Sequence, residues 1–309
     1  MASESKKGMN YLSVVNLNEW IATNKSSFAP PVCNKLMFGR GELKVMFIGG
    51  PNIRKDYHLE EGEELFFQIE GKMCLESWEK NKQLPLNIEE GEIFVLPGYF
   101  CHSPQRFENT VGLVIERERK QTELDVLRWY QLDKESGKPL PGKILYQENF
   151  HCVDLGSQLV PVIKRYFASD SHRTGQPVEK VPDTPIKENT TDALDRPQSL
   201  EKLLSSLEAF GGEKHRLQLF NAREFKVVAS MPASDPLGKT TLKHEKLVWL
   251  KSNPTQEKVV LSIFGESPQT LNLSKSGDLC LIPANLPHSI ETKSEKAVVI
   301  EIWVTPDNN

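Results

Sequence analysis

Two stretches of this chain share one frame of glycine, acid, apolar residues, proline and histidine. GEIFVLPGYFCHS (residues 91–103) and GDLCLIPANLPHS (residues 277–289) match without a gap. Because a chance match of this length and pattern is improbable, we interpret the chain as an internal repeat. The frame lies among short apolar or alternating runs separated by glycine, proline, asparagine and acidic turns, which is the pattern of β-strands. Two related β-domains are therefore predicted.

The predicted fold class is mostly β, with two small β-barrel or jelly-roll domains and a few short helices. Helices are expected at 17–25, capped by Asn16 or Asn18, at 154–169, and from Ser199 to about residue 212. The segment 174–198 is polar and rich in proline, so we expect an extended linker and no core element. The predicted domains are 1–170, 171–212 (linker and helix) and 213–309. First-half strands are expected at 43–50, 64–71, 72–79, 84–88, 92–97 and 111–119.

Composition narrows the classes of function. The 309 residues are 38% hydrophobic and 26% charged with a net charge of -4, which gives no electrostatic case for nucleic acid or a membrane surface as partner. The N-terminus lacks an apolar run of signal-peptide length, and no later run approaches a membrane span, so a cytoplasmic location is predicted. The five scattered cysteines form no CxxC pair, which argues against both a disulfide framework and a thiolate zinc site.

Three residues of the first half form a candidate metal site. His58 closes one predicted strand, Glu64 begins the next, and His102 follows a third, so the three side chains could converge from neighbouring strands. Two neutral imidazoles and one carboxylate are the set that holds non-haem Fe(II) and leaves positions open for chemistry. The alternative is that two isolated histidines and a glutamate in an acidic loop are surface residues.

The spacing around these residues resembles that of the cupin family. The first cupin motif fits Gly50, His58, Glu64 and Gly71, and the second fits Gly91, Pro97 and His102. Asp56 stands where the general pattern has its first histidine, which leaves three ligands in place of four. Glu63 would also suit the generic ligand spacing, but only Glu64 preserves the interval to Gly71. The resemblance implies a bicupin in which the first domain holds the metal.

The second half keeps the frame without the ligands. Alignment of the two halves puts Lys246 where Glu64 stands and Thr240 where His58 stands, so His288 remains alone. His244 lies nearby at the wrong offset. A single imidazole beside a lysine would bind Fe(II) poorly, so the C-terminal domain is predicted to carry no metal.

Two arginines flank the candidate ligands. Arg54 lies four residues before His58, and Arg106 lies four residues after His102. Positions four apart on an extended strand share a face and lie roughly 13 Å apart, so an arginine could reach a substrate on the metal. A guanidinium can bind a carboxylate through two hydrogen bonds. The alternative for Arg106 is a surface ion pair with Glu108.

Longer segments resemble the 3-hydroxyanthranilate 3,4-dioxygenase family of the animal two-domain type. The segments are PPVCNKLM, LKVMFIGGPNIRKDYHLEEGEE, HSPQRFENTVGLVIERER and TELDVLRWY, and the resemblance covers nearly all of the first 170 residues. It implies ring cleavage of 3-hydroxyanthranilate by O2 to 2-amino-3-carboxymuconate semialdehyde, the precursor of quinolinate in NAD biosynthesis from tryptophan through the kynurenine pathway. The implied residues are His58, Glu64 and His102 on Fe(II), Arg106 on the substrate carboxylate, Glu116 on the ring substituents, Arg54 by the dioxygen position and Asn34 near the substrate.

Some roles stay open. Glu116 could act as a general base toward the substrate hydroxyl, act only as a hydrogen-bond partner, or be a solvated charge at a strand end. The CxxC pairs that hold a second iron in bacterial relatives are missing from this sequence. We expect internal pairing of two barrels to replace their subunit pairing, so a monomer is predicted.

Two other functions fit the same motif. A zinc cupin isomerase acting on a sugar phosphate would also use His and Glu ligands, with the arginines on phosphate. A cupin binding or storage protein would need no ordered set of three ligands. Metal analysis and the response of ligand binding to His58→Ala and His102→Ala separate these possibilities.

Overall fold

The computed structural model describes residues 8–29, 33–52, 55–177, 180–209, 216–231, 237–294 and 296–305. The chain divides into two compact units. We call Ser27–Asn34 with Ile48–Pro197 the central unit, and Met1–Ser26 with Lys35–Phe47 and Gln198–Asn309 the C-terminal unit. The predicted domain limits at 170 and 212 stay predictions.

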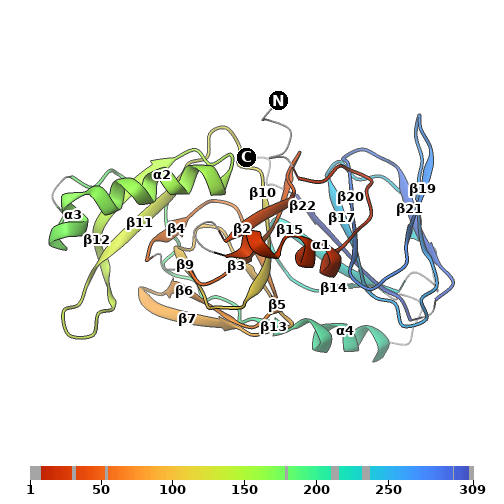
Figure 1. The fold of residues 1–309 in the computed structure, drawn as a ribbon, viewed down its shortest axis with the longest axis horizontal. Coiled ribbons are helices and arrows are strands. Elements are labelled where there is room, and N and C mark those ends of the chain that lie inside the picture. Colours follow the sequence, from red (N-terminus) through yellow and green to blue (C-terminus); the bar gives the residue numbers. More distant parts are fainter. Residues whose placement is uncertain are drawn as a thin grey trace. The chain divides into compact units, whose positions relative to one another are not determined.

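The central unit is built from antiparallel strands (Figure 1). One of its sheets has the order β12-β11-β4-β9-β6-β7, and a second includes β8-β5-β10. Two helices, α2 (Leu155–Ala168) and α3 (Asp170–Thr174), follow the last strand. The strands are β4 (Tyr57–Leu59), β5 (Glu64–Glu70), β6 (Met73–Glu79), β7 (Lys82–Ile88), β8 (Glu92–Leu96), β9 (His102–Arg106), β10 (Val111–Arg117), β11 (Asp125–Leu132) and β12 (Pro139–Phe150).

Turn residues fix the register of these strands. Lys80 and Asn81 both have positive φ, so β6 and β7 are joined by a two-residue turn whose twist matches that of the strands, and Glu79 pairs with Lys82. Gly71 and Gly91 also take positive φ next to β5 and β8, at the two glycines of the predicted motifs. The strands expected from the sequence are present, whereas β9, β11 and β12 were not predicted.

Helix α2 lies along β11 and β12 (Figure 1). Its Val162 and Tyr166 are buried against Leu127 and Trp129, and the Trp129 and Tyr166 rings stack with centroids 4.0 Å apart. Pro161 lies inside the helix without ending it. This packing stabilises the helix in spite of the proline.

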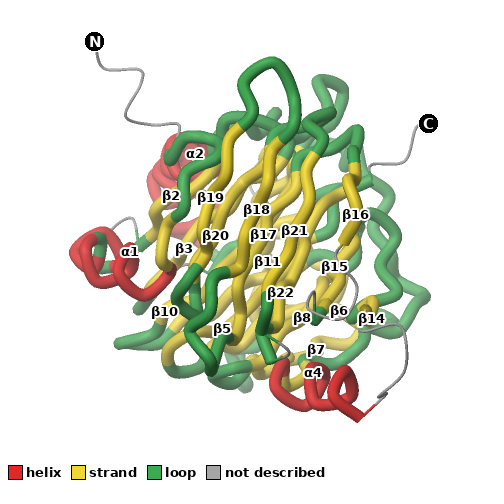
Figure 2. Tube along the Cα trace, turned by 90° about the vertical axis from the view of Figure 1, so that its right-hand side faces the viewer, coloured by secondary structure: helices red, strands yellow, loops and turns green. Residues whose placement is uncertain are grey.

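The C-terminal unit repeats the strand-rich pattern (Figure 2). Its sheets have the orders β1-β20-β17-β22-β15-β14 and β16-β21-β18-β19. Asn16 caps α1 (Leu17–Thr23) by accepting from the N–H groups of Asn18 and Glu19, and Ser199 accepts from Lys202 N–H at the start of α4 (Leu200–Ala209). The strands are β1 (Val15–Asn16), β13 (Gln198–Ser199), β14 (Arg216–Gln218), β15 (Phe225–Ser230), β16 (Leu237–Thr240), β17 (Lys246–Ser252), β18 (Val259–Ile263), β19 (Gln269–Leu273), β20 (Asp278–Ile282), β21 (His288–Thr292) and β22 (Val298–Val304).

Strands β2 (Asn34–Phe38) and β3 (Leu43–Gly49) complete the set, together with a short 3-10 turn, η1 (Lys25–Phe28). The predicted fold class, mostly β with a few short helices, is confirmed. Two sheets in a strand-rich unit are compatible with a jelly roll.

The segment 174–198 is not the simple linker that we expected. Its Ile186 is 4% exposed and belongs to a core cluster with Tyr57, Leu59 and Val126. The expectation that this segment contributes nothing to the core is wrong, because an apolar residue in a polar run can occupy a core position when its neighbours are anchored; Leu194 of the same segment is also 4% exposed. Arg128 provides such an anchor by donating to Glu188 at 2.8 Å and to Thr184 at 3.2 Å.

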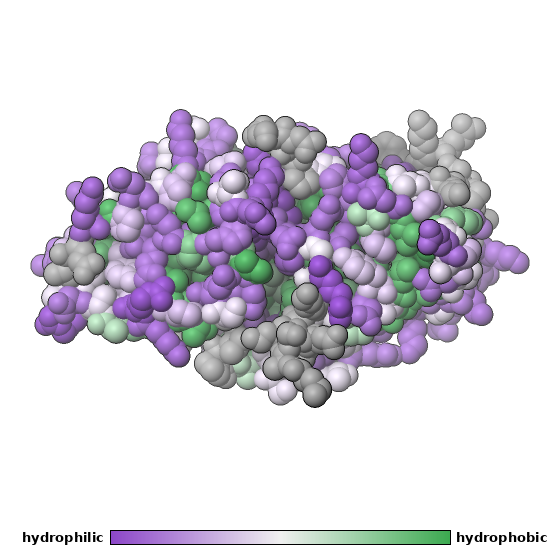
Figure 3. Space-filling view, turned by 90° about the horizontal axis from the view of Figure 1, so that it is seen from above, coloured by the Kyte–Doolittle hydropathy of each residue, from purple (hydrophilic) through white to green (hydrophobic). Residues whose placement is uncertain are grey.

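Hydrophilic side chains cover most of the face in Figure 3, with scattered hydrophobic residues between them. None of the described helices is long and apolar enough to span a membrane.

Candidate metal centre

Three buried side chains from three strands meet in the central unit. His58 lies in β4, Glu64 begins β5 and His102 begins β9, and they are 8%, 4% and 2% exposed. One potential ligand atom from each lies within 4.8 Å of the others. His58 and His102 are direct partners in the β4–β9 register, which explains how residues distant in sequence come together. The alternative that they are surface residues is wrong.

The orientation of His102 suits a ligand. Its Nδ1 lies 3.0 Å from the Phe100 carbonyl, to which it donates, so Nε2 is left with a lone pair directed at Glu64. That Nε2 lies 2.9 Å from Glu64 Oε1, an oxygen that is buried and makes no hydrogen bond among the described residues. Two electron-pair donors that face each other at this distance need a cation or a proton between them. The residues therefore fit a divalent metal ion.

The two side chains also shift each other's pKa. Burial favours the neutral forms of both groups, but their mutual attraction outweighs it, lowering the pKa of Glu64 and raising that of His102. Glu64 is thus a carboxylate over the whole physiological range, as a metal ligand must be.

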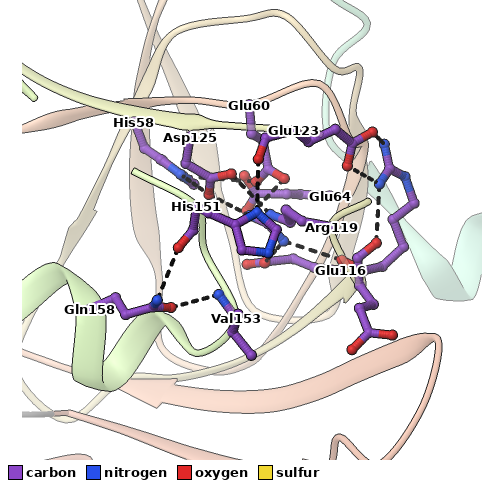
Figure 4. Close-up of polar contacts among 12 residues, drawn as sticks. His58, Glu60, Glu64, Glu116, Arg119, Glu123, Asp125, His151, Val153 and Gln158 are labelled. Carbon is purple, nitrogen blue, oxygen red and sulfur yellow. Dashed lines mark hydrogen bonds and ion pairs between the residues drawn. The ribbon is translucent and has the colours of Figure 1, made fainter. Parts of the chain in front are cut away.

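A cluster of buried charges surrounds Arg119 and reaches His58 through Asp125 (Figure 4). Arg119 contacts Glu60 at 2.7 Å, Glu116 at 2.5 Å and Asp125 at 3.0 Å, and Asp125 lies 2.8 Å from Nε2 of His58. Burial raises the pKa of Glu60 and of Glu116. Burial opposes ionisation of Asp125 as well, but Arg119 and His58 lower its pKa.

Glu116 is not a solvated charge at a strand end. It is 3% exposed, contacts Arg119 and pairs with Glu64 in the β10–β5 register. Glu60, Glu64 and Glu116 have carboxylate oxygens within 4.8 Å of one another. Glu116 therefore lies beside the candidate ligands, where it could exchange a proton with a bound molecule.

Arg106, Asn34 and Arg54 were expected to lie around the metal and the substrate, and the structure describes two of them. Arg106 is 4% exposed, so the alternative of a surface ion pair with Glu108 is wrong. Its backbone N–H donates to Asn52 at 2.8 Å, and its guanidinium donates to the Ile48 carbonyl at 3.4 Å. Asn34 begins β2 and is partly exposed. Arg54 lies outside the described residues. The roles expected for these three residues stay predictions.

Glu63 and Glu64 were both considered as the carboxylate ligand. Glu63 is 3% exposed, but the described residues that group as potential metal ligands include Glu64 and not Glu63. The geometry thus agrees with the choice made from the interval to Gly71.

The C-terminal unit has different residues at the equivalent positions. Thr240 pairs with His288 as His58 pairs with His102, and Lys246 pairs with Ile282 as Glu64 pairs with Leu96. Lys246 Nζ lies 2.5 Å from Glu301 Oε2, and both residues are buried. Burial and the nearby Lys246 lower the pKa of His288. His244 lies 3.3 Å from Glu42, so it is engaged elsewhere.

Glu60, Arg119 and Asp125 were not predicted from the sequence. Their partners come from the β4–β11 pairing and from the loop after β10, which no local motif specifies. A usable signal was Asp125 at the start of the run DVLRWY, in which Arg128 is the other charged residue, because a charge that opens a buried strand needs a partner.

A family model described as 3-hydroxyanthranilic acid dioxygenase matches residues 9–167. A Nematostella vectensis protein named 3-hydroxyanthranilate 3,4-dioxygenase is 50% identical to this chain over 214 residues. The alignment covers 68% of this chain and 74% of that protein. The rat protein of that name is 50% identical and the human one 49% identical, each over 62% of this chain and 65% of its own length. The chain thus covers slightly less than two thirds of these two relatives.

The fold was also compared with solved structures. A mutant of Bacillus subtilis oxalate decarboxylase aligns with 99% of this chain and 80% of its own, at a TM-score of 0.48 and 14% identity. A likeness at that score supports no conclusion about function.

Proposed function

We propose, because the chain belongs to the 3-hydroxyanthranilic acid dioxygenase family, that it cleaves the ring of 3-hydroxyanthranilate with O2 to give 2-amino-3-carboxymuconate semialdehyde. The observation that carries the proposal is the buried set of His58, Glu64 and His102 within the matched residues. We further propose that the product feeds quinolinate and NAD biosynthesis through the kynurenine pathway.

The proposed metal is Fe(II), held by His58, Glu64 and His102. Two imidazoles and one carboxylate leave open positions for substrate and O2 on an iron ion, which when bound supplies the redox chemistry of ring opening. Asp125 beside His58 and the Phe100 carbonyl beside His102 would orient the two rings.

The substrate carboxylate is proposed to bind Arg106. A guanidinium offers two parallel donors that match a carboxylate, and burial of Arg106 strengthens such a pair by excluding water. Asn34 is proposed to lie near the substrate and Arg54 near the dioxygen position, in keeping with the family resemblance.

Glu116 is proposed to take the proton of the substrate hydroxyl. A general base works best when its pKa lies near the operating pH, and burial raises the pKa of Glu116 toward that range. Its partner Arg119 would hold the carboxylate in place while the proton moves. We also propose a cytoplasmic monomer; a stable dimer in sedimentation at micromolar concentration would contradict the monomer.

The test is anaerobic reconstitution with Fe(II), followed by 3-hydroxyanthranilate and then O2. We expect the near-ultraviolet absorbance of the semialdehyde to rise only after O2 is added. No rise in the reconstituted protein would exclude the proposal. Isomerase activity on a sugar phosphate that persists in the zinc-loaded protein under strict anaerobiosis would favour the isomerase.

Two histidine variants supply a matched control. His102 and His288 are both 2% exposed and both contact the carbonyl two residues earlier, at 3.0 and 2.9 Å. His102→Ala should abolish iron binding and turnover, whereas His288→Ala should retain both. Equal losses would show that the effect comes from the fold and not from the metal centre.

A further inference from the structure

Arg119 is a buried cation that contacts three carboxylates. It lies in the loop after β10, and its side chain is 5% exposed. Nη1 donates to Glu116 at 2.5 Å and to the Arg117 carbonyl at 3.2 Å, while Nη2 donates to Asp125 at 3.0 Å and forms an ion pair with Glu60 at 2.7 Å. Nε donates to the other oxygen of Asp125 at 3.2 Å. All three nitrogens of the guanidinium are thus engaged.

One of these contacts reaches a candidate metal ligand through Asp125. Asp125 Oδ2 lies 3.0 Å from Arg119 Nη2 and 2.8 Å from His58 Nε2, so a single oxygen joins the guanidinium to the imidazole (Figure 4). A ring nitrogen that donates to a carboxylate fixes the tautomer and the orientation of the ring, and leaves the second nitrogen with its lone pair. Asp125 itself is 1% exposed, so water does not compete for this contact.

A second contact reaches the residue opposite Glu64. Arg119 binds Glu116, and Glu116 pairs with Glu64 in the β10–β5 register. Without a cation, the buried carboxylates of Glu60, Glu116 and Asp125 would repel one another and Glu64. A planar guanidinium can bind all three at once, whereas the compact ammonium of lysine cannot reproduce the two-point contact with Asp125.

We propose that Arg119 is a positioning residue of the metal centre: through Asp125 it fixes the His58 ring, and through Glu116 it fixes the wall opposite Glu64. This inference rests on the metal centre of the proposed function. It adds that metal affinity and ligand geometry depend on two residues that are not ligands.

The chain offers a matched control two residues away. Arg117 is also buried. It is the last residue of β10 and binds Glu123 through two contacts of 2.7 Å each. Glu123 is not among the grouped candidate ligands of the described residues. Loss of Arg117 therefore removes a buried ion pair of the same kind without removing the link to His58.

The experiment measures Co(II) binding without substrate, by competition with a chelator, together with the ligand-field absorption spectrum of the Co(II) protein. Asp125→Asn keeps the shape of the side chain and should weaken Co(II) binding by about 10- to 100-fold, with an altered spectrum. Arg119→Met should do the same, and Arg119→Lys should restore part of the affinity. Arg117→Met should lower stability to urea but leave Co(II) affinity within about twofold of the unaltered protein, since Arg117 does not bind the carboxylate that orients His58.

A folded Asp125→Asn protein with unchanged affinity and spectrum would overturn the inference, as would an equal loss in Arg117→Met. If Arg119→Met does not fold, Asp125→Asn decides. Co(II) binding in an unaltered protein whose Fe(II) form lacks turnover would exclude the dioxygenase but leave the role of Arg119 standing. Absence of Co(II) binding in the unaltered protein would overturn both.

Discussion

Gly112 leaves the space in which the Arg106 guanidinium lies. A Cβ at this position would meet Arg106 Nη1 at 2.6 Å and Gln68 Oε1 at 2.9 Å, both of them ends of flexible side chains. An alanine would therefore displace the guanidinium while the strand remains intact. If Arg106 binds the substrate carboxylate as proposed, Gly112 is expected to influence substrate binding through the position of that guanidinium.

Gly112→Ala should raise KM for 3-hydroxyanthranilate about fivefold. This corresponds to a loss of about 1 kcal/mol from the proposed hydrogen bonds between Arg106 and the substrate carboxylate. Iron content should stay normal, because the candidate ligands are not moved. Steady-state kinetics with iron analysis checks this. Gly265→Ala, whose Cβ would make only an ordinary contact of 3.5 Å with Leu286, should change neither value.

Arg106→Ala should have the larger effect. Loss of the carboxylate partner should raise KM about 10- to 100-fold, in line with about 1.5–3 kcal/mol for a hydrogen bond to a charged group. Since Arg106 ends β9 four residues after His102, iron should still bind. Loss of iron in this variant, measured by metal analysis, would mean that the assigned role is wrong.

Strands β16, β17 and β21 of the C-terminal unit keep the frame with other residues at the positions of the candidate ligands. Lys246 occupies the position of Glu64 and forms a buried ion pair with Glu301, which Arg216 also contacts at 3.1 Å. A side chain thus brings a positive charge to this position. We expect removal of one member of this pair to lower the free energy of unfolding strongly, and replacement of both members by apolar residues to change it little.

Lys246→Met should lower the free energy of unfolding by about 3 kcal/mol, because the buried Glu301 loses its buried cation and keeps, among the residues that the structure describes, the ion pair with the half-exposed Arg216. The double variant Lys246→Met with Glu301→Leu should recover most of that loss. Urea unfolding measures both. Lys275→Met, which breaks the exposed pair with Glu19, should change the free energy of unfolding far less; an equally small change for Lys246→Met would contradict this prediction.

Local spacing predicted which side chains come together. His58, Glu64 and His102 were selected from the glycine and proline frame and lie close together, while their role as metal ligands stays a prediction. The offset of Thr240 and Lys246 in the second half matches the observed registers. The strands β11 and β12 were missed because Arg128, Gln147 and other charged or polar residues interrupt their apolar pattern, and these residues are buried with partners from distant segments. Such pairings arise only once the sheets have formed.

Buried thiols link the stability of the whole molecule to alkaline pH. The five cysteines are all free and buried, and burial raises the pKa of Cys280 from 9.0 to about 12. Below pH 9 the folded and unfolded states both keep this proton. Above pH 9 the unfolded state loses the proton and the folded state retains it, so the free energy of unfolding falls as pH rises.

Between pH 8 and pH 10.5 this single thiol should remove about 2 kcal/mol of stability. Cys280→Ala lacks the group, so its stability should fall less over this interval, whatever the cost of the cavity at pH 8. Urea unfolding at both pH values measures the difference. Parallel losses in the two proteins would contradict the link.

Ile186 constrains the length of the segment that contains it. Connecting segments usually accept insertions and deletions because they only span a distance. Here Thr184 and Glu188 bind Arg128, Ile186 lies between them in the core, and Leu194 N–H donates to Glu79 at 2.9 Å. Deletion of one residue between Thr184 and Leu194 would pull Ile186 out of the core behind the strand of His58. Homologues should therefore keep this stretch at constant length, as they would a core strand, and an engineered tag or cleavage site should be placed elsewhere.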